Sequence, residues 1–217
     1  MAAKRRWDVQ DHTMVREKAA MRLKYLPPQA RVLDLFCGNG EMYARVYQER
    51  AEHYHGVDKR TIHNPAICTL ADNVAYITRA DLSGYNVFDL DDYGCPWRQL
   101  YLLLGKLKQA EVTVFMTDGL VLHQRVDGRV TKFASATERL RRDFNVPGMN
   151  RWYLPMFATM LLDAGKRYGW QTELATYFHN ARRTVYYWCL KLSRGPRELT
   201  KGQRSAIMEE EGGAKWT

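Results

Sequence analysis

A short apolar run that ends in a glycine-rich turn constrains the fold of this chain more than any other feature. The run RVLDLFC (31–37) has the composition of a buried parallel strand, and it breaks at Gly38-Asn39-Gly40. The next segment, GEMYARVYQERA, continues with the pattern of a helix. Glycines at such a junction let the backbone turn tightly and approach a ligand without a Cβ in the way. The segment therefore predicts a strand–loop–helix unit of an α/β fold.

Strands and helices are expected to alternate along most of the chain. A helix is expected over 13–25, where Pro27-Pro28 stop it. Further strands are expected over 52–58, 74–81, 86–91 and 111–119. Further helices are expected in the stretch 61–73, after Pro96, and over about 150–168, where Pro155 favours a later start or a kink.

The last two strands decide the topology. Residues 171–178 and 183–192 both read as strands, and only the four residues 179–182 join them. A parallel crossover needs a dozen or more residues, so this pair should be antiparallel. An alternating β/α pattern that ends in an antiparallel hairpin is typical of the S-adenosylmethionine (SAM) dependent methyltransferase fold. The predicted fold class is α/β: a Rossmann-like SAM methyltransferase fold with a mainly parallel sheet and a C-terminal antiparallel hairpin.

This pattern also suggests how the chain is organised. Residues 1–28 are expected to form an N-terminal helical extension, and 29–193 the methyltransferase domain. A basic insertion interrupts this domain at about 120–148. Residues 194–217 are expected to form a tail that is a loosely attached helix or disordered.

The first expected strand carries the candidate cofactor site. It ends in Asp-x-Phe-x-Gly-x-Gly (34–40), and Asp58 follows Asp34 by 24 residues, at the end of the second strand. A carboxylate there can accept both ribose hydroxyl protons. Tyr43 stands where the dinucleotide fingerprint has its third glycine, which favours SAM over NAD. An ordinary strand-to-helix turn is the alternative reading.

An acidic residue at the end of the third expected strand would lie beside the adenine of the cofactor. Asp81-Leu82 occupies that position, and the carboxylate could accept from the adenine amino group. A plain strand-end carboxylate is an equally good interpretation. The residues predicted to bind the cofactor are Asp34, Phe36, Gly38, Gly40, Asp58, Lys59, Asp81, Leu82 and Asp89.

The candidate acceptor site follows the fourth expected strand. Ligands of open α/β sheets bind outside the carboxyl ends of the strands, so this segment should face the same crevice as the cofactor. Asp89 and Asp91 share one face of the strand. Asp91 could orient an exocyclic amine and take its proton, while Tyr93 could stack on the base. The alternative is an acidic loop that caps the helix beginning at Pro96.

Three segments resemble one enzyme family. VFDLDDYGCP (87–96) is similar to the Asp-x-Asp-Pro-Phe/Tyr-Gly-Ser-Pro acceptor motif of the tRNA guanine-N2 dimethyltransferases. VFMTDGLVL (114–122) resembles the fifth-strand Thr-Asp segment of that family, and 161–192 resembles its last helix end and final strands. The resemblance implies a Rossmann-like domain that binds SAM and methylates guanine N2 in RNA, with tRNA as a candidate substrate.

The acceptor motif departs from the family pattern at two positions. Asp92 replaces the proline, and Cys95 replaces the serine. The catalytic residues that the resemblance and the strand end together predict are Asp91, Asp92 and Tyr93. Because DLFCGNG also resembles the first motif of cytosine- and uracil-C5 methyltransferases, C5 chemistry at Cys95 is an alternative, although Cys95-Pro96 reverses their Pro-Cys order. Methylation of a DNA amine, of a protein or of a small molecule, and a non-catalytic nucleic-acid-binding protein, are further alternatives.

The net charge of +9 favours a polyanionic partner such as nucleic acid, and we expect RNA rather than DNA. Basic residues gather in and just after the insertion, where a solvated helix face is the alternative reading. The predicted nucleic-acid contacts are Arg125, Arg129, Lys132, Arg139, Arg141, Arg142 and Arg151.

The cysteines and histidines suggest neither disulfides nor a metal site. The 4 cysteines lie far apart without a CxxC pair, which fits a reducing cytosol and a cytoplasmic protein. His53 and His55 share a strand face and His63 follows, but a metal would need a further ligand, so no metal is expected. No apolar run approaches the ~20 residues of a membrane span, so no membrane partner is expected.

Overall fold

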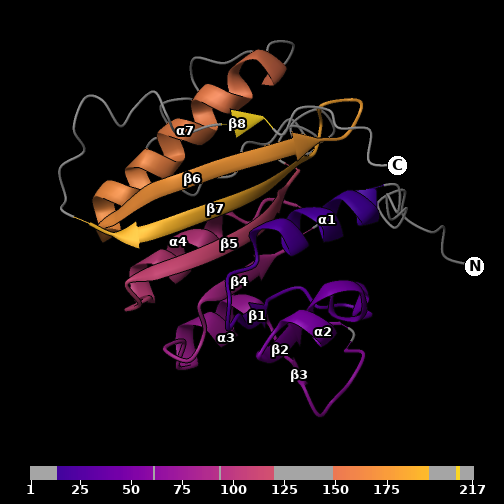
Figure 1. Ribbon diagram of the computed structural model, residues 1–217. Coiled ribbons are helices and arrows are strands. Elements are labelled where there is room, and N and C mark those ends of the chain that lie inside the picture. The colour runs from indigo at the N-terminus through magenta and orange to yellow at the C-terminus, as the bar shows by residue number, and fades with distance from the viewer. Residues whose placement is uncertain (1–13, 61, 93, 120–148, 196–208, 211–217) are drawn as a thin grey trace, which may run out of the picture.

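A single mixed sheet organises the computed structural model, which describes residues 14–60, 62–92, 94–119, 149–195 and 209–210 (Figure 1). The strand order is β3-β2-β1-β4-β5-β7-β6-β8. The strands are β1 (Arg31–Asp34), β2 (His53–Asp58), β3 (Cys68–Leu70), β4 (Val87–Leu90), β5 (Glu111–Asp118), β6 (Trp170–His179), β7 (Tyr186–Arg194) and β8 (Glu209–Glu210). The helices are α1 (Val15–Tyr25), the π-helical η2 (Tyr43–Tyr47), α2 (Gln48–Arg50), α3 (Asn73–Arg79), α4 (Trp97–Lys106) and α7 (Met149–Tyr168).

The direction of the strands confirms the predicted fold class. Strands β1 to β5 are parallel, and β7 runs antiparallel between β5 and β6. The tight turn from β6 to β7 is held by Asn180, whose side-chain oxygen accepts from the backbone N–H of Thr184 at 2.9 Å. The strand order reverses between β1 and β4, and in open α/β sheets the ligand crevice lies at such a point, outside the carboxyl ends of the strands.

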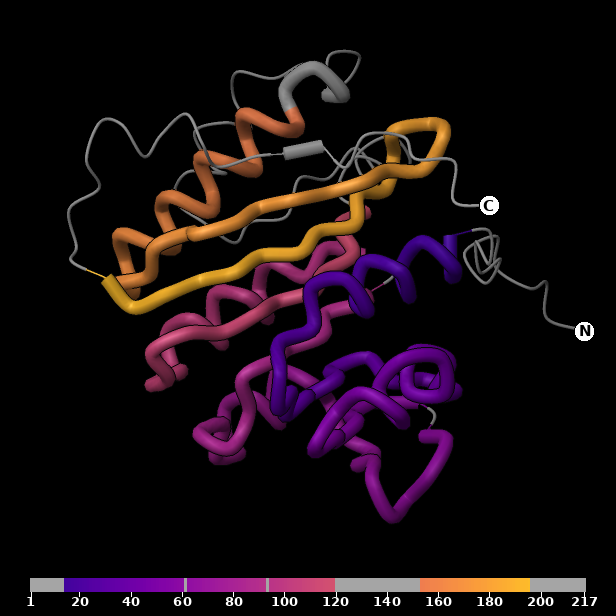
Figure 2. Tube along the Cα trace, in the orientation of Figure 1, coloured from indigo at the N-terminus to yellow at the C-terminus, as the bar shows by residue number. Residues whose placement is uncertain are grey.

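Each face of the sheet packs against its own set of helices (Figures 1 and 2). Helices α3, α4 and α7 cover one face, where Trp97, Phe157 and Trp188 are completely buried. Helix α1 and the η2 segment cover the other face around Val32 and Tyr47. The expected N-terminal helix is therefore confirmed, and it packs directly on the sheet.

The expected third strand over 74–81 is wrong: residues 74–79 belong to α3, and β3 lies within the stretch 61–73 that was expected to be helical. The side chain of Asp72 caps α3 by accepting from the N–H of Ala75 at 3.0 Å. Ile77 then turns into the core, with 1% of its surface exposed. Valine and isoleucine suggested a strand here. The N-terminal cap and the burial of only one side of the segment favour a helix instead.

Two smaller expectations also change. Helix α7 begins at Met149 and continues through Pro155, so the later start is wrong. Within the tail, Glu209 and Glu210 form β8 beside β6, where a helix or disorder was expected. In the part of the chain that the structure describes, no helix combines the length and the apolar character that crossing a membrane requires.

Candidate cofactor and acceptor site

The register of the parallel strands brings the predicted carboxylates to one edge of the sheet. Asp34 at the end of β1 pairs with Gly56 of β2 on one side and with Asp89 of β4 on the other. Asp58 and Asp91 lie two residues further along those neighbouring strands. Because side chains alternate with a period of two, all these side chains share the face that α1 covers. The carboxyl edge therefore carries an acid on each side of the loop that follows β1.

The glycine loop lies over the end of β2. Gly38 and Gly40 have φ values of +46° and +77°, the left-handed region that favours glycine. The N–H of Gly38 donates to Asp58 Oδ2 at 3.3 Å, and the N–H of Arg60 donates to Asp58 Oδ1 at 2.7 Å. The two oxygens of Asp58 thus join the glycine loop to the segment that follows β2. Lys59 beside it is exposed.

Asp34 supports this loop from beneath. Only 3% of Asp34 is exposed, and its two oxygens accept from the N–H of Phe36 at 3.1 Å and the hydroxyl of Tyr54 at 3.0 Å. Burial, together with the nearby Asp89, raises the pKa of Asp34 well above its ordinary value. Asp34 thus fixes the start of the loop.

Asp81 and Leu82 lie away from the crevice. They follow the C-terminal end of α3, so they stand before β4, at the opposite edge of the sheet from Asp58. Asp81 is fully exposed and accepts from Ser83, while Leu82 is buried in the core. Asp81 and Leu82 were predicted to lie beside the adenine because the preceding residues were expected to form a strand. Those residues form helix α3 instead.

Asp72 is the acidic residue that follows β3 in the structure. Its exposed side chain caps α3 at the carboxyl edge of the sheet. The neighbouring Asn73 donates from its amide to the carbonyl of Leu35 at 3.5 Å, which ties this corner to the residues just before the glycine loop. Asp72, and not Asp81, is therefore the acidic residue at the end of the third strand.

Asp89, expected at the cofactor, is instead sealed beneath α1. It is completely buried, and Arg22 forms two hydrogen bonds to it, from Nε and Nη2, each of 2.7 Å. The hydroxyl of Tyr47 donates to the same carboxylate at 2.5 Å. Although burial opposes the charge, Asp89 raises the pKa of Arg22, so the guanidinium stays charged. Asp89 thus anchors α1 to the sheet and does not face a ligand.

Asp91 is less deeply buried than Asp89, with 15% of its side chain exposed. Lys18 Nζ lies 2.7 Å from Oδ1, and Thr117 donates to the same oxygen at 2.5 Å. Burial alone would raise the pKa of Asp91, but Lys18 and Arg22 outweigh it and hold that pKa below its ordinary value. An ionised acid of this kind orients a donor well and takes a proton poorly.

The loop after β4 packs against the end of β5. The N–H of Gly119 donates to the carbonyl of Gly94 at 2.7 Å, and Asp92 and Cys95 are both partly buried. Behind them the buried Asp118 accepts from Trp97 Nε1 at 2.8 Å and from the Tyr153 hydroxyl at 2.9 Å. This network fixes the start of α4 and hence the acceptor loop.

Sequence reasoning missed Lys18 and Arg22, which the fold brings to the acidic edge. Their spacing of four residues places them on one side of α1, a signal that is present in the sequence of the expected N-terminal helix.

The structure leaves several predictions untested. Tyr93 and the basic residues 125–142 lie outside the described residues, as does the side chain of Arg151.

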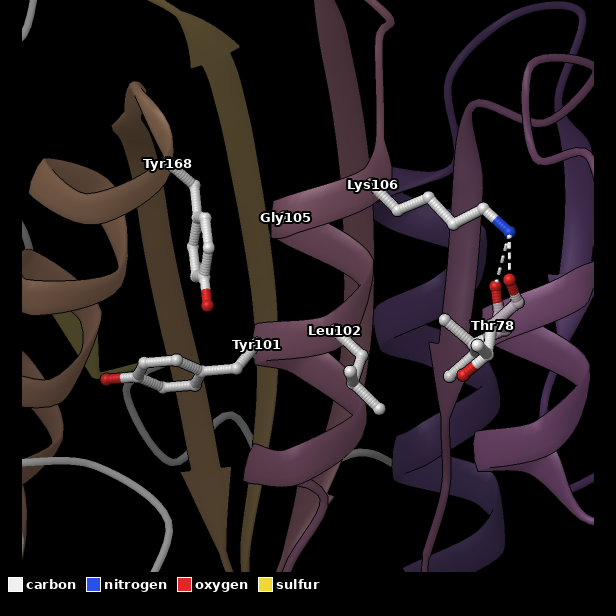
Figure 3. Close-up of a pocket in the computed structure, with 7 residues that line it drawn as sticks. Thr78, Tyr101, Leu102, Gly105, Lys106 and Tyr168 are labelled. Atoms are coloured by element: carbon white, nitrogen blue, oxygen red, sulfur yellow. Dashed lines mark hydrogen bonds between the residues drawn. The ribbon is translucent and has the colours of Figure 1, made fainter.

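A hollow of about 280 Å³ lies far from this edge, between α3, α4 and α7. Figure 3 shows Tyr101, Leu102, Lys106 and Tyr168 around it. Lys106 donates to the carbonyls of Ile77, Thr78 and Ala80 at the C-terminal end of α3. Lysine there satisfies carbonyls that a helix end leaves unpaired, so its role is structural.

Comparison with known proteins finds solved structures that share this fold. No protein-family model matches the sequence, and no curated protein sequence matches it. Trm1 from Pyrococcus horikoshii, solved with S-adenosyl-L-methionine, matches with a TM-score of 0.56 and 12% identity over 85% of this chain and 56% of that one. The 1,6-didemethyltoxoflavin-N1-methyltransferase of Burkholderia thailandensis, solved with S-adenosylhomocysteine, matches with a TM-score of 0.52 and 12% identity over 86% and 80% of the two chains.

A Lactococcus lactis protein described provisionally as a hemolysin has a TM-score of 0.51 and 10% identity, over 89% of this chain and 92% of that one. Identities this low show the fold alone. The chain has the Rossmann-like fold seen in SAM-dependent methyltransferases.

Proposed function

We propose that this protein is a SAM-dependent methyltransferase. The observation that carries the proposal is the contact between the glycine loop and Asp58, in which Gly38 and Gly40 take left-handed conformations over a carboxylate at the end of β2. In this arrangement Asp58 accepts the ribose hydroxyls, and the loop at 36–40 receives the methionine part. Asp72 lies on the adenine side. The two methyltransferases with the same fold were solved with SAM or its demethylated product, which supports this cofactor.

The acceptor is proposed to be an exocyclic amine, guanine N2 in particular. Two of the three segments that resemble the guanine-N2 family, 87–96 and 114–122, meet in space, since Thr117 donates to Asp91 and Gly119 donates to Gly94. Asp91, held ionised, accepts a hydrogen bond from the amine and aims its lone pair at the methyl group. Asp92 lies next to it in place of the family's proline and is the second candidate for this contact.

RNA is the proposed substrate. The net charge of +9 favours a polyanion, and the basic insertion follows in the sequence after Gly119, a residue that contacts the acceptor loop. A guanine would have to flip out of its stack to reach Asp91. Incubation with labelled SAM and separate tRNA, rRNA, DNA and protein fractions tests this proposal. Label in N2-methylguanine of an RNA digest is the expected result, and label on a ring carbon or in protein would contradict it.

The cofactor site is tested by isothermal titration with SAM. Asp58→Asn should weaken SAM binding by about 1.5–3 kcal/mol, because hydrogen bonds to a charged acceptor are lost. Asp81→Asn is the matched control, since Asp81 is exposed at the opposite edge, and its affinity should equal that of the wild type. Equal affinities for both variants in folded protein would refute this placement of the cofactor.

A further inference from the structure

Three metal-ligating side chains meet behind the glycine loop. Cys37 follows β1, His63 lies in the loop between β2 and β3, and Cys68 is the first residue of β3. One ligand atom from each lies within 4.8 Å of the others, and Cys68 Sγ is 3.5 Å from His63 Nδ1. Both cysteines are buried, while His63 is partly exposed. No short motif marks this cluster in the sequence, because its three residues come from three different segments.

The surrounding backbone leaves room for these side chains. A Cβ on Gly56 would lie 2.7 Å from Cys68 Sγ and 2.9 Å from Cys37 Sγ, distances at which something must shift. The φ of Gly56 is not positive, so space, and not backbone conformation, calls for glycine here. Likewise, a Cβ on Gly40 would overlap the ring of His63. The absence of a side chain at Gly40 and Gly56 thus leaves the space that the three candidate ligands occupy.

The distances fit a tetrahedral ion. Zn–S bonds of about 2.3 Å and Zn–N bonds of about 2.0–2.1 Å separate sulfur from nitrogen by about 3.6 Å in a tetrahedron. Cys68 Sγ lies 3.5 Å from His63 Nδ1, the nitrogen that would bind the ion, close to this value. Two sulfurs and an imidazole nitrogen form a set that zinc prefers over magnesium or calcium. We propose that Cys37, His63 and Cys68 bind Zn²⁺, with water as the fourth ligand on the partly exposed side of His63.

The proposed ion joins two loops of the cofactor site. Cys37 begins the glycine loop, and His63 and Cys68 belong to the segment that follows Asp58. An ion bound to all three would fix the loop containing Gly38 against the segment containing Asp58. Zinc should therefore strengthen SAM binding. This consequence rests on the proposed function, whereas the proposal that the protein binds zinc does not depend on it.

Cobalt titration tests the site directly. The full chain, purified under reducing conditions and stripped of metal, is titrated with Co²⁺ and then with Zn²⁺. We expect about one equivalent of Co²⁺, intense tetrahedral visible bands and a thiolate-to-cobalt charge-transfer band, all abolished by Zn²⁺. A folded wild-type protein that shows no charge-transfer band overturns the proposal, whatever its affinity for SAM.

Matched variants identify the ligands. His63→Gln changes a partly exposed loop residue and should fold, and Cys68→Ser tests one sulfur. Each should weaken metal binding by more than about 100-fold. Loss of a residue that only hydrogen-bonds to a metal ligand already lowers metal affinity by about 10–100-fold, and loss of a ligand should lower it further. His53→Gln and Cys189→Ala are the controls, because these residues lie outside the cluster, and both should bind metal as the wild type does. If His63→Gln binds Co²⁺ as tightly as His53→Gln, the proposal is wrong.

Discussion

Removal of the Arg22 side-chain charge should destabilise this protein more than most single substitutions. Arg22 has 3% of its side chain exposed, Asp89 has none, and two hydrogen bonds of 2.7 Å join them. Arg22→Met keeps the apolar stem of the side chain but removes the guanidinium, and it leaves the buried carboxylate with the hydroxyl of Tyr47 as a neutral donor.

The magnitude follows from the burial of both partners. Removing one member of a buried ion pair costs about 3–5 kcal/mol, because the other charge stays desolvated without compensation. The total free energy of unfolding of a domain is about 5–15 kcal/mol, so Arg22→Met should lose a large part of it. The double variant Arg22→Met, Asp89→Leu removes both charges and should recover most of the loss.

Urea unfolding followed by circular dichroism measures these differences. Arg16→Met is the matched control, since Arg16 is exposed on the same helix, and its free energy of unfolding should stay within about 0.5 kcal/mol of the wild type. A loss below about 1 kcal/mol in Arg22→Met would refute the reasoning, as would a double variant that is less stable than the single one.

Two further predictions concern the acceptor site and the packing behind the glycine loop. Asp91→Asn should keep the affinity for SAM in titration and lose about 10²-fold in methyl transfer to RNA, because the negative charge that orients the amine is gone; turnover within tenfold of the wild type would contradict this role. Gly56→Ala should lower the free energy of unfolding of the metal-free protein by about 1–3 kcal/mol in urea, because its Cβ would press on Cys37 and Cys68. Gly84→Ala, where the nearest side-chain atom is 3.8 Å away, is the control, and equal losses in both variants would argue against overpacking.

Several parts of the fold could be predicted from the sequence because short-range rules determine them. Four residues between two strands permit only an antiparallel pair, and β6 and β7 form one. The glycine loop breaks β1 where an apolar run meets Gly38, and Asp58 ends β2 as its position in the sequence suggested. Period-two alternation correctly placed Asp89 and Asp91 on one face, since Arg22 contacts both.

Other parts could not be predicted because they depend on residues distant in the chain. Valine and isoleucine within 74–81 suggested a strand, but Asp72 caps a helix there, and this shift moved the third strand end away from Asp81. No local signal identified Asp72 as the acid at the carboxyl edge, since this assignment required the position of β3.

The sequence by itself determined the class of fold and the edge at which its acids gather. Only the tertiary structure decided what each acid does, because the environment of a carboxylate depends on the partner that packing brings to it. Asp89 and Asp91 are two residues apart and look alike in the sequence. Arg22, 67 residues away from Asp89, seals that carboxylate in the core, whereas Asp91 keeps part of its surface at the crevice beside Lys18. Burial and pairing separate an anchor of the fold from a candidate site residue.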